Sequence, residues 1–451
     1  MADSRTIAIG APYYGPGASI GQVRVLKWDG SGWQPKGIPL EGPQIGSCFG
    51  ASISMPDTLT LAIGAPYHDD VQTNTGLIRI FHWKNGAWMQ KGTDLKGFMP
   101  WERMGYCVSM PDSNTVAVSS PFASSISTYN VGKVQVFRWN GTQWVSKGPP
   151  LYGIVGDGAF GYSLCMPDSN TLAVSCPFSD INMPFSSAVT VYQWNGVSWS
   201  LQGAPITSTS YLSFNGYSLS MPDAQTIAVG EPAYGVTLEG RVRIFQWDGN
   251  QWVLLGTPIY GAAGDYAGTS VSMPDELTVA VGAPGSQVSL EVVPYNSMAF
   301  GQNSVFIWDG SSWVMKGTSL TGEAAGDHFG ASVHMPDAAT LAVGAPFNDD
   351  GGFEAGHVRV FSWTATAIPQ LDFAEDPWVF PNPAEGVLFV TAPDQLSITW
   401  LRLVHPHGKI LSQTAIRDNR CQLTLPPDAG YYLLELHTSE GKRIYRKIFR
   451  K

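Results

Sequence analysis

Short apolar stretches alternate with turn residues along most of the chain, and they recur at a regular interval. The tripeptide Met-Pro-Asp, or a close copy, recurs with its methionine at positions 1, 55, 110, 166, 221, 273 and 335. Each copy is followed by a threonine and then by an apolar stretch that ends in proline, such as LAIGAP or VAVSSP. This pattern predicts a tight turn that leads into a strand, because proline fixes φ and aspartate accepts hydrogen bonds from the following backbone.

The rest of each repeat predicts further strands. Segments such as KVQVFRW (133–139) and HVRVFSW (357–363) carry apolar residues at both alternating sets of positions, so both faces of the strand are covered. Asn-Gly or Asp-Gly between two tryptophans then predicts a type I′ hairpin. A glycine-centred strand such as CFGASIS completes the unit.

Seven units of four short strands predict an all-β, seven-bladed β-propeller over residues 1–363. The first and last repeats are each one strand short. Residues 1–42 lack an innermost strand, and residues 328–363 lack an outermost one. We therefore expect the N-terminal closing half-blade to be missing from this sequence. The hypothesis is that the reading frame begins upstream, with a signal peptide and roughly 25 residues of closing strand.

Composition narrows the function classes. Charged residues make up 14% of the 451 residues and the net charge is −10, which argues against disorder and against nucleic-acid binding. No apolar run is long enough to predict a membrane-spanning helix. The five cysteines have no paired spacing, so neither a zinc site nor a disulfide framework is expected.

The repeats resemble a known family. Phe49-Gly50 with Gly64-Ala65-Pro66, and the equivalent residues at 329–330 and 344–346, are similar to the FG-GAP repeats of integrin α-subunit propellers and bacterial surface proteins. The resemblance extends over residues 1–363. The calcium loop of that family is shortened here to Met-Pro-Asp-x-x-Thr, which leaves too few oxygen ligands for calcium, so no metal is expected there.

The C-terminal part of the chain differs from the repeats. Residues 364–377 read as a linker, and residues 378–451 carry ten Lys and Arg against six Asp and Glu. Short strands such as ITWLRLV and YYLLELHT, separated by Pro, Gly and Asp, predict a small Ig-like β-sandwich.

This segment resembles the C-terminal sorting domain of type IX secretion cargo. The residues that carry the resemblance are Pro381, Asn382, Pro383, Gly408, Gly430, Tyr431, Lys447 and Lys451. The resemblance implies export through the outer-membrane type IX machinery of a Bacteroidota-type bacterium, after which the protein is secreted or anchored at the cell surface. A plain Ig-like binding module is the alternative.

Candidate binding residues lie in variable loops, because residues that recur in every repeat are explained by blade geometry. Loops on a rigid scaffold are common binding sites. The longest loop, at 285–300, includes Tyr295, and Trp101 is the only propeller tryptophan outside the hairpin pattern. The candidates are Asp69, Asp70, Trp101, Glu102, Arg103, Tyr295, Asp349 and Asp350.

The sequence favours a secreted or cell-surface adhesion protein that binds a protein or glycan through this loop face. No H-E-x-x-H pair or G-x-S-x-G elbow occurs, so neither catalytic activity nor a cofactor is expected. The alternatives are a polysaccharide-acting propeller hydrolase or lyase, whose carboxylates would come from different blades, and a structural component of an extracellular matrix.

Overall fold

The protein is described by a computed structural model whose described part contains strands and connecting loops and no helix. None of the described segments is therefore a helix long and apolar enough to cross a membrane. The chain divides into two compact units, Met1–Ser362 and Trp363–Lys451. The described residues are 1–15, 19–70, 72–125, 128–154, 156–178, 187–208, 210, 213–285, 299–352, 354–363, 378–380, 387–391, 398–404, 410–415, 420–426, 430–439 and 443–450.

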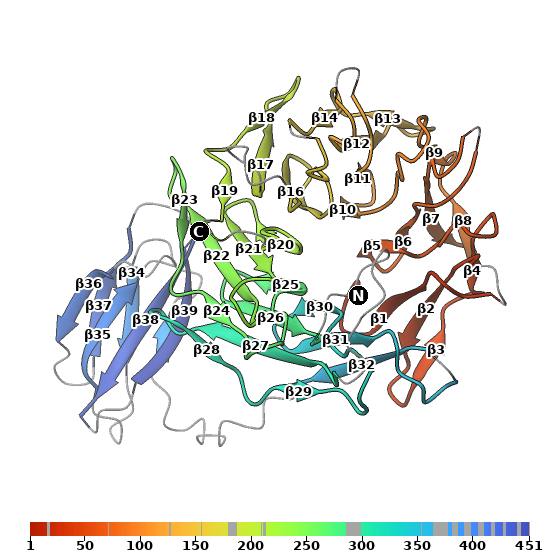
Figure 1. The fold of residues 1–451 in the computed structure, drawn as a ribbon. Helices are drawn as coiled ribbons and strands as arrows, with labels where there is room; N and C mark the ends of the chain where they lie inside the picture. The colour runs from red at the N-terminus through yellow and green to blue at the C-terminus, as the bar shows by residue number, and fades with distance from the viewer. Residues whose placement is uncertain are drawn as a thin grey trace. The chain divides into compact units, whose positions relative to one another are not determined.

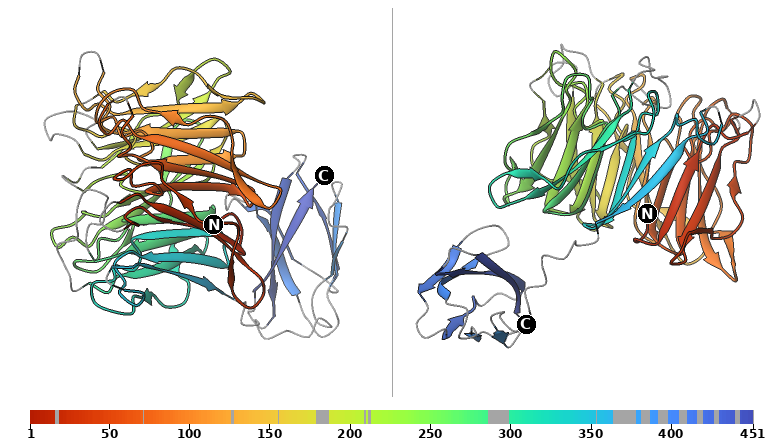
Figure 2. Two further views of the ribbon diagram at one scale, coloured as in Figure 1. Left: turned by 90° about the vertical axis from the view of Figure 1, so that its right-hand side faces the viewer. Right: turned by 90° about the horizontal axis from the view of Figure 1, so that it is seen from below.

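In the described part of the first unit, seven antiparallel sheets follow one another along the chain and surround a common centre (Figure 1). A complete sheet has an inner strand, a GAP strand and a central strand, in that order. The central strand also pairs with a short hairpin strand and a two-residue rim strand. Figure 2 shows these sheets side by side. The all-β propeller is thus confirmed, and the number of blades stays a prediction.

The strands of the first unit fall into five classes by their place in the sheet. The inner strands are β5 (Ser52–Asp57), β10 (Val108–Asp112), β15 (Leu164–Asp168), β20 (Leu219–Asp223), β25 (Ser270–Asp275) and β30 (Ser332–Asp337). The GAP strands are β1 (Thr6–Ala11), β6 (Thr60–Ala65), β11 (Thr115–Ser120), β16 (Thr171–Cys176), β21 (Thr226–Glu231), β26 (Thr278–Ala283) and β31 (Thr340–Ala345). The central strands are β2 (Gln22–Trp28), β7 (Leu77–Lys84), β12 (Lys133–Trp139), β17 (Ala188–Trp194), β22 (Arg241–Trp247), β27 (Gln302–Trp308) and β32 (His357–Ser362). The hairpin strands are β3 (Trp33–Pro35), β8 (Ala87–Gln90), β13 (Trp144–Ser146), β18 (Trp199–Leu201), β23 (Trp252–Leu254) and β28 (Trp313–Met315). The rim strands are β4 (Leu40–Glu41), β9 (Leu95–Lys96), β14 (Leu151–Tyr152), β19 (Ile206–Thr207), β24 (Ile259–Tyr260) and β29 (Leu320–Thr321).

The first and last sheets are smaller than the others. Among the described residues, the first sheet (β1–β4) has no inner strand, and the last (β30–β32) has no hairpin or rim strand. In each of the six sheets with a described hairpin strand, the predicted fourth strand is broken into a hairpin strand and a rim strand. The break falls at the Lys-Gly positions, where glycines such as Gly92 and Gly148 adopt positive φ angles of 80° and 85°.

The core lies between neighbouring sheets, because both faces of each sheet are apolar. Val23 and Val25 of the first sheet pack against Leu61, Ile63 and Leu77 of the second, and each of these side chains is at most 4% exposed. Burying a side chain of this kind contributes about 1.5–3 kcal/mol to the free energy of unfolding. The same arrangement is repeated at the following sheet interfaces.

The FG and GAP glycines are required by the close approach of neighbouring sheets. A Cβ on Gly64, in the GAP strand β6, would lie 2.1 Å from the carbonyl oxygen of Gly105, which precedes the next inner strand. Ser52 Oγ donates a hydrogen bond of 2.7 Å to the same oxygen. The two halves of the motif therefore form one contact between sheets.

The hairpin tryptophans also join neighbouring sheets. Trp144 Nε1 donates a hydrogen bond of 2.8 Å to the carbonyl oxygen of Lys91 in the preceding sheet. The Lys91 ammonium lies 5.3 Å from the ring centroids of both Trp139 and Trp144, within reach of a cation–π attraction. The recurring Trp and Lys-Gly positions are therefore packing positions, as the repeat pattern predicted.

Two local predictions are corrected by the structure. Met-Pro-Asp ends the inner strand rather than forming the turn, with a register shift between Ser54 and Asp57, because an inner edge strand accepts a proline that lacks an N–H. The second correction concerns the hairpin turn. The predicted type I′ turn is found in the second sheet, where Asn85 and Gly86 have its positive φ angles. In the first sheet the turn has four residues, and the Asp29 carboxylate accepts the N–H groups of Ser31 and Gly32 instead.

The second unit contains two antiparallel sheets. One holds β33 (Trp378–Phe380), β34 (Val387–Thr391) and β37 (Arg420–Thr424), and the other holds β35 (Ile398–Val404), β36 (Ile410–Ala415), β38 (Gly430–Thr438) and β39 (Arg443–Arg450). Leu388 and Leu423 of the first sheet pack with Leu401, Leu434 and Ile448 of the second in a core that is at most 4% exposed. This packing of two sheets is that of a small β-sandwich.

Candidate functional site: the loop face

We call the end of the sheets where the GAP strands end and the central strands begin the loop face, and the opposite end the turn face. Exposed aromatic side chains gather on the loop face. In the described part of the chain, the exposed Phe, Trp and Tyr residues are Tyr13, Tyr14, Phe98, Trp101, Tyr129, Tyr152, Tyr260 and Phe300. All of them lie in loop-face segments or at the loop-face ends of rim strands. The turn-face tryptophans, in contrast, are buried or partly buried in edge-on or tilted pairs.

Trp101 is held outward by its backbone. Its indole is 55% exposed, and the residue has a positive φ of 62°. The Trp101 N–H donates to the carbonyl oxygen of Thr73 at 2.8 Å, and the Arg103 N–H donates to that of Asn74 at 3.0 Å. Positive φ angles at non-glycine residues cost about 1–3 kcal/mol each, so this loop stores strain that the surrounding contacts must offset.

We expected Glu102 to lie at the surface, but its side chain is buried and only 1% exposed. It accepts hydrogen bonds of 3.0 Å from the N–H groups of Phe98 and Met99 and forms an ion pair with Lys133. Burial by itself would raise the pKa of this carboxyl, but Lys133 and the two N–H groups outweigh burial and hold its pKa below the usual value. Glu102 therefore shapes the loop that presents Trp101 and offers no free carboxylate.

The Arg103 guanidinium packs against an aromatic cluster that we did not predict. The guanidinium lies 4.9 Å from the ring centroid of Tyr67 and 4.4 Å from that of Phe122. Further rings continue the cluster across the next two sheets: Tyr106, Tyr162, Phe178, Phe214 and Tyr217. The sequence signal was present, since a tyrosine follows the FG-position glycine in three successive repeats.

The predicted acidic residues have different roles. Asp69 accepts the Asn74 N–H at 2.7 Å, and Asp349 accepts the Glu354 N–H at 2.6 Å, so both carboxylates close their own loops. Asp70 forms an ion pair of 3.1 Å with Lys96. These contacts account for three of the four aspartates as loop-stabilising groups.

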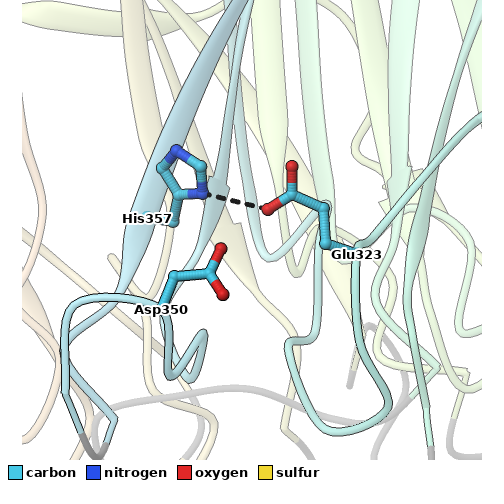
Figure 3. Close-up of side chains that lie close together, drawn as sticks. All are labelled: Glu323, Asp350 and His357. Atoms are coloured by element: carbon cyan, nitrogen blue, oxygen red, sulfur yellow. Dashed lines mark ion pairs between the residues drawn. The ribbon is translucent and has the colours of Figure 1, made fainter.

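Asp350, the fourth aspartate, lies beside Glu323 and His357 (Figure 3). One ligand atom from each residue can be chosen so that all three lie within 4.8 Å of one another. His357 Nδ1 is 3.3 Å from Glu323 Oε2, and Arg359 Nη1 is 3.3 Å from Glu323 Oε1. The sequence analysis did not find Glu323 or His357, because the three residues are separated along the chain and form no recognised spacing.

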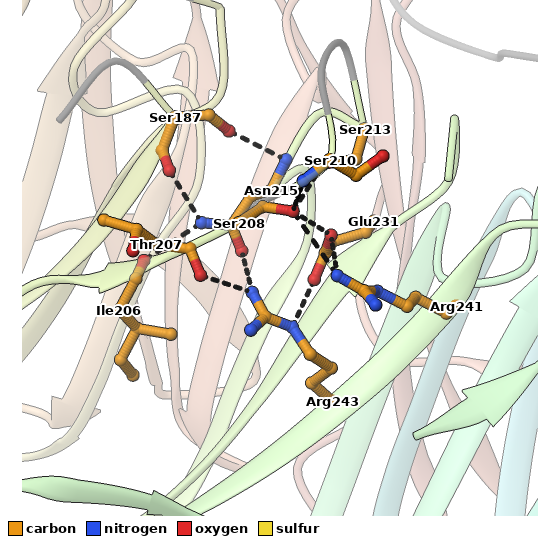
Figure 4. A network of polar contacts seen from close by, with 10 residues as sticks. All are labelled: Ser187, Ile206, Thr207, Ser208, Ser210, Ser213, Asn215, Glu231, Arg241 and Arg243. Atoms are coloured by element: carbon orange, nitrogen blue, oxygen red, sulfur yellow. Dashed lines mark hydrogen bonds and ion pairs between the residues drawn. The ribbon is translucent and has the colours of Figure 1, made fainter. Parts of the chain in front are cut away.

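A second polar group breaks the symmetry of the repeats (Figure 4). Glu231 occupies the position of the GAP alanine and is fully buried, and it forms ion pairs with Arg241 and Arg243. Arg243 also donates to the carbonyl oxygen of Thr207 and to Asn215 Oδ1, each at 3.0 Å. Because this buried carboxylate is neutralised by its own arginines, the network holds the loop after β19 against the central strand β22.

Several predicted residues fall where the structure describes less. Tyr295 lies outside the described residues, as do Pro381, Asn382, Pro383, Gly408 and Lys451. Gly430 and Tyr431 lie in β38 and Lys447 in β39, where Gly430 is opposite Arg450 and Leu433 is opposite Lys447. The binding role of Tyr295 and the sorting role of the C-terminal residues stay predictions.

Comparison with known proteins places residues 321–361 in the FG-GAP repeat model. A hypothetical selenium-binding protein from Sulfolobus tokodaii is similar in structure, with 9% identity, a TM-score of 0.50 and coverage of 97% of this chain and 94% of that one. A candidate 6-phosphogluconolactonase from Bacteroides fragilis NCTC 9343 has 10% identity, a TM-score of 0.50 and coverage of 94% and 99%. The GH74 enzyme of Niastella koreensis has 10% identity, a TM-score of 0.42 and coverage of 99% and 66%. No curated protein matches the sequence.

These comparisons correct one expectation. The missing catalytic motifs led us to expect that the chain is not an enzyme, but its structural neighbours include proteins named as enzymes, the candidate lactonase among them. Absence of a motif is thus no argument against catalysis on this scaffold, and identities this low establish the fold alone. From the sheets of residues 1–362 and the matched segment, the chain is a β-propeller protein in which residues 321–361 match the FG-GAP repeat.

Proposed function

We propose that the chain is an extracellular binding protein that takes a glycan on the loop face of its propeller. The observation that carries this proposal is the one-sided distribution of exposed aromatic rings. Trp101 and Tyr129 are 55% and 81% exposed, and neither belongs to a position that recurs in every repeat. Blade geometry therefore does not account for them.

Polar groups next to these rings support a glycan as the ligand. Trp101 is hydrogen-bonded to the backbone of Thr73, and beside Tyr129 the Asn130 amide donates to Asp157 Oδ1 at 3.0 Å. A sugar ring has apolar C–H faces and a rim of hydroxyls, so it is recognised by an aromatic face with hydrogen-bonding groups at its edge. The Tyr129 ring, with Asn130 and Asp157 beside it, offers such a subsite.

The same proposal includes export by the type IX machinery. Its support is the order of the Pro-Asn-Pro, Gly-Lys, Gly-Tyr-Tyr and basic terminal motifs in residues 378–451, in a segment that folds as a separate β-sandwich. The protein would then be secreted or anchored at the outer-membrane surface of a Bacteroidota-type bacterium. The loop face would then be accessible to extracellular polysaccharide.

Glycan binding is tested by screening the full chain on a glycan array and measuring the affinity of the best ligand by calorimetry. Replacing Trp101 or Tyr129 by alanine is expected to weaken binding at least about tenfold, since removal of a stacking ring costs on the order of 2 kcal/mol. Val197→Ala, at an 80% exposed position in a turn-face hairpin, is the matched control and leaves the affinity unchanged. Equal affinity in all three variants, or binding of a protein and of no glycan, would contradict the proposal.

Export is tested separately in a bacterium that carries the type IX machinery. The full chain, supplied with a signal peptide, is expected in the medium or at the cell surface, whereas the chain without residues 378–451 is expected to remain in the periplasm. Fractionation and immunodetection distinguish the two locations. Appearance of the shortened chain outside the cell would show that this segment is not the export signal.

A further inference from the structure

Three side chains that can bind a metal converge on the loop face from the last sheet and from the loop that leads into it (Figure 3). Glu323 follows the rim strand β29, Asp350 lies in the loop between β31 and β32, and His357 begins the central strand β32. All three can place a ligand atom within 4.8 Å of the other two, and none of these side chains is deeply buried. An ion from solution can therefore reach them without opening the fold.

The donor set identifies the class of ion. One imidazole nitrogen and two carboxylate oxygens suit zinc and its transition-metal neighbours, which accept three protein ligands and complete their coordination with water. Calcium prefers six to eight oxygen ligands, and a set with one nitrogen and two side-chain carboxylates does not supply them. Arg359 shares the Glu323 carboxylate at 3.3 Å, so the cluster is less negative than its two acids alone would be. A divalent ion nevertheless meets two carboxylates and one imidazole.

An equivalent loop in the second sheet provides an internal comparison. The sequence YHDD at 67–70 corresponds to FNDD at 347–350, so Asp70 occupies the place of Asp350. Asp70 already forms an ion pair with Lys96, and the position that corresponds to His357 is Leu77. The rim strand β29 belongs to the preceding sheet, and the last sheet has no described rim strand. Among the described residues, Asp350 therefore lies near a histidine and has no equivalent of Lys96 beside it.

We propose that Glu323, Asp350 and His357 form a site for a divalent transition-metal ion, with zinc as the probe. The ion would join the loop after β29 to the loop after β31 and fix both at the loop face. This site uses none of the aromatic residues of the proposed glycan surface and does not depend on that function.

Calorimetric titration of the metal-free full chain with zinc chloride tests the proposal, with magnesium chloride as the ion that this donor set disfavours. Saturable binding of zinc is expected, and His357→Asn, Glu323→Gln and Asp350→Asn are each expected to weaken it by roughly tenfold or more. Asp70→Asn, in the equivalent loop, is the matched control and retains the wild-type affinity. Because the Glu→Gln and Asp→Asn changes keep the size of the side chain, circular dichroism and thermal melting without metal are expected to match the wild type.

Cobalt provides an independent readout that reports on the ligands. The visible absorption of bound Co²⁺ is expected to change in His357→Asn, because the only nitrogen ligand is lost. Zinc affinity within twofold of the wild type in all three ligand variants overturns the proposal, since any zinc bound would then reside on other residues. A magnesium affinity equal to that of zinc overturns it as well, because the donor set would not be selecting the ion.

Discussion

Lys133→Met is expected to destabilise the propeller by about 3–5 kcal/mol at pH 7, because it leaves the Glu102 carboxylate buried without its cation. Glu102 is 1% exposed, so water cannot replace the lost partner. Urea denaturation followed by tryptophan fluorescence measures the change. The double variant Glu102→Gln with Lys133→Met is the control, and we expect it to be more stable than Lys133→Met, because the buried charge is removed with its partner.

The cost of Lys133→Met is also expected to depend on pH. In the wild type the pKa of Glu102 is lowered, so its contribution to stability is present above the ordinary carboxyl pKa and is lost as the pH falls through the lowered value. In the variant, burial without the ammonium raises the pKa of Glu102, and protonation then relieves the unpaired charge. The difference between wild type and variant should therefore be largest at pH 7 and smaller near pH 4. A difference that does not change with pH would contradict the role assigned to this pair.

Gly92→Ala is expected to destabilise the propeller more than Gly317→Ala, although the two glycines have nearly the same backbone conformation. Their φ angles are 80° and 77°, so the cost of a Cβ at positive φ, about 1–2 kcal/mol, is common to both variants. A Cβ on Gly92 would also lie 2.8 Å from Trp139 Cζ3, whereas one on Gly317 has no neighbour within 4 Å. Overpacking against the next sheet adds about 1–3 kcal/mol to the cost of Gly92→Ala.

The comparison of these glycines isolates the contact between sheets. Both variants are measured by urea denaturation at the same pH and temperature, and the difference between their free energies of unfolding reports the clash with Trp139 and Trp144. The recurring Lys-Gly positions would then be explained by the tryptophan of the following sheet. Equal free energies of unfolding would show that the next sheet accommodates the added Cβ without loss of stability. The glycine would then be needed only for its φ angle.

The sequence by itself determined the strands and their grouping into sheets. Strand identity depends on local alternation and turn chemistry, and both recur in every repeat, so the predicted KVQVFRW segment agrees with β12 (Lys133–Trp139). The packing role of the hairpin tryptophans followed from the same repetition. Details within a repeat were less predictable: Pro56 lies inside β5 rather than in the turn, because an edge strand tolerates its missing N–H.

Only the tertiary structure decided which polar residues meet and which are exposed. Glu102 and Trp101 are neighbours in sequence, yet one is buried against Lys133 and the other is largely in solvent. Glu323 and His357 come together across two neighbouring sheets, because β29 belongs to one sheet and β32 to the next. The physical reason is that secondary structure follows from local periodicity, whereas the contacts of a side chain depend on how separate strands and loops pack.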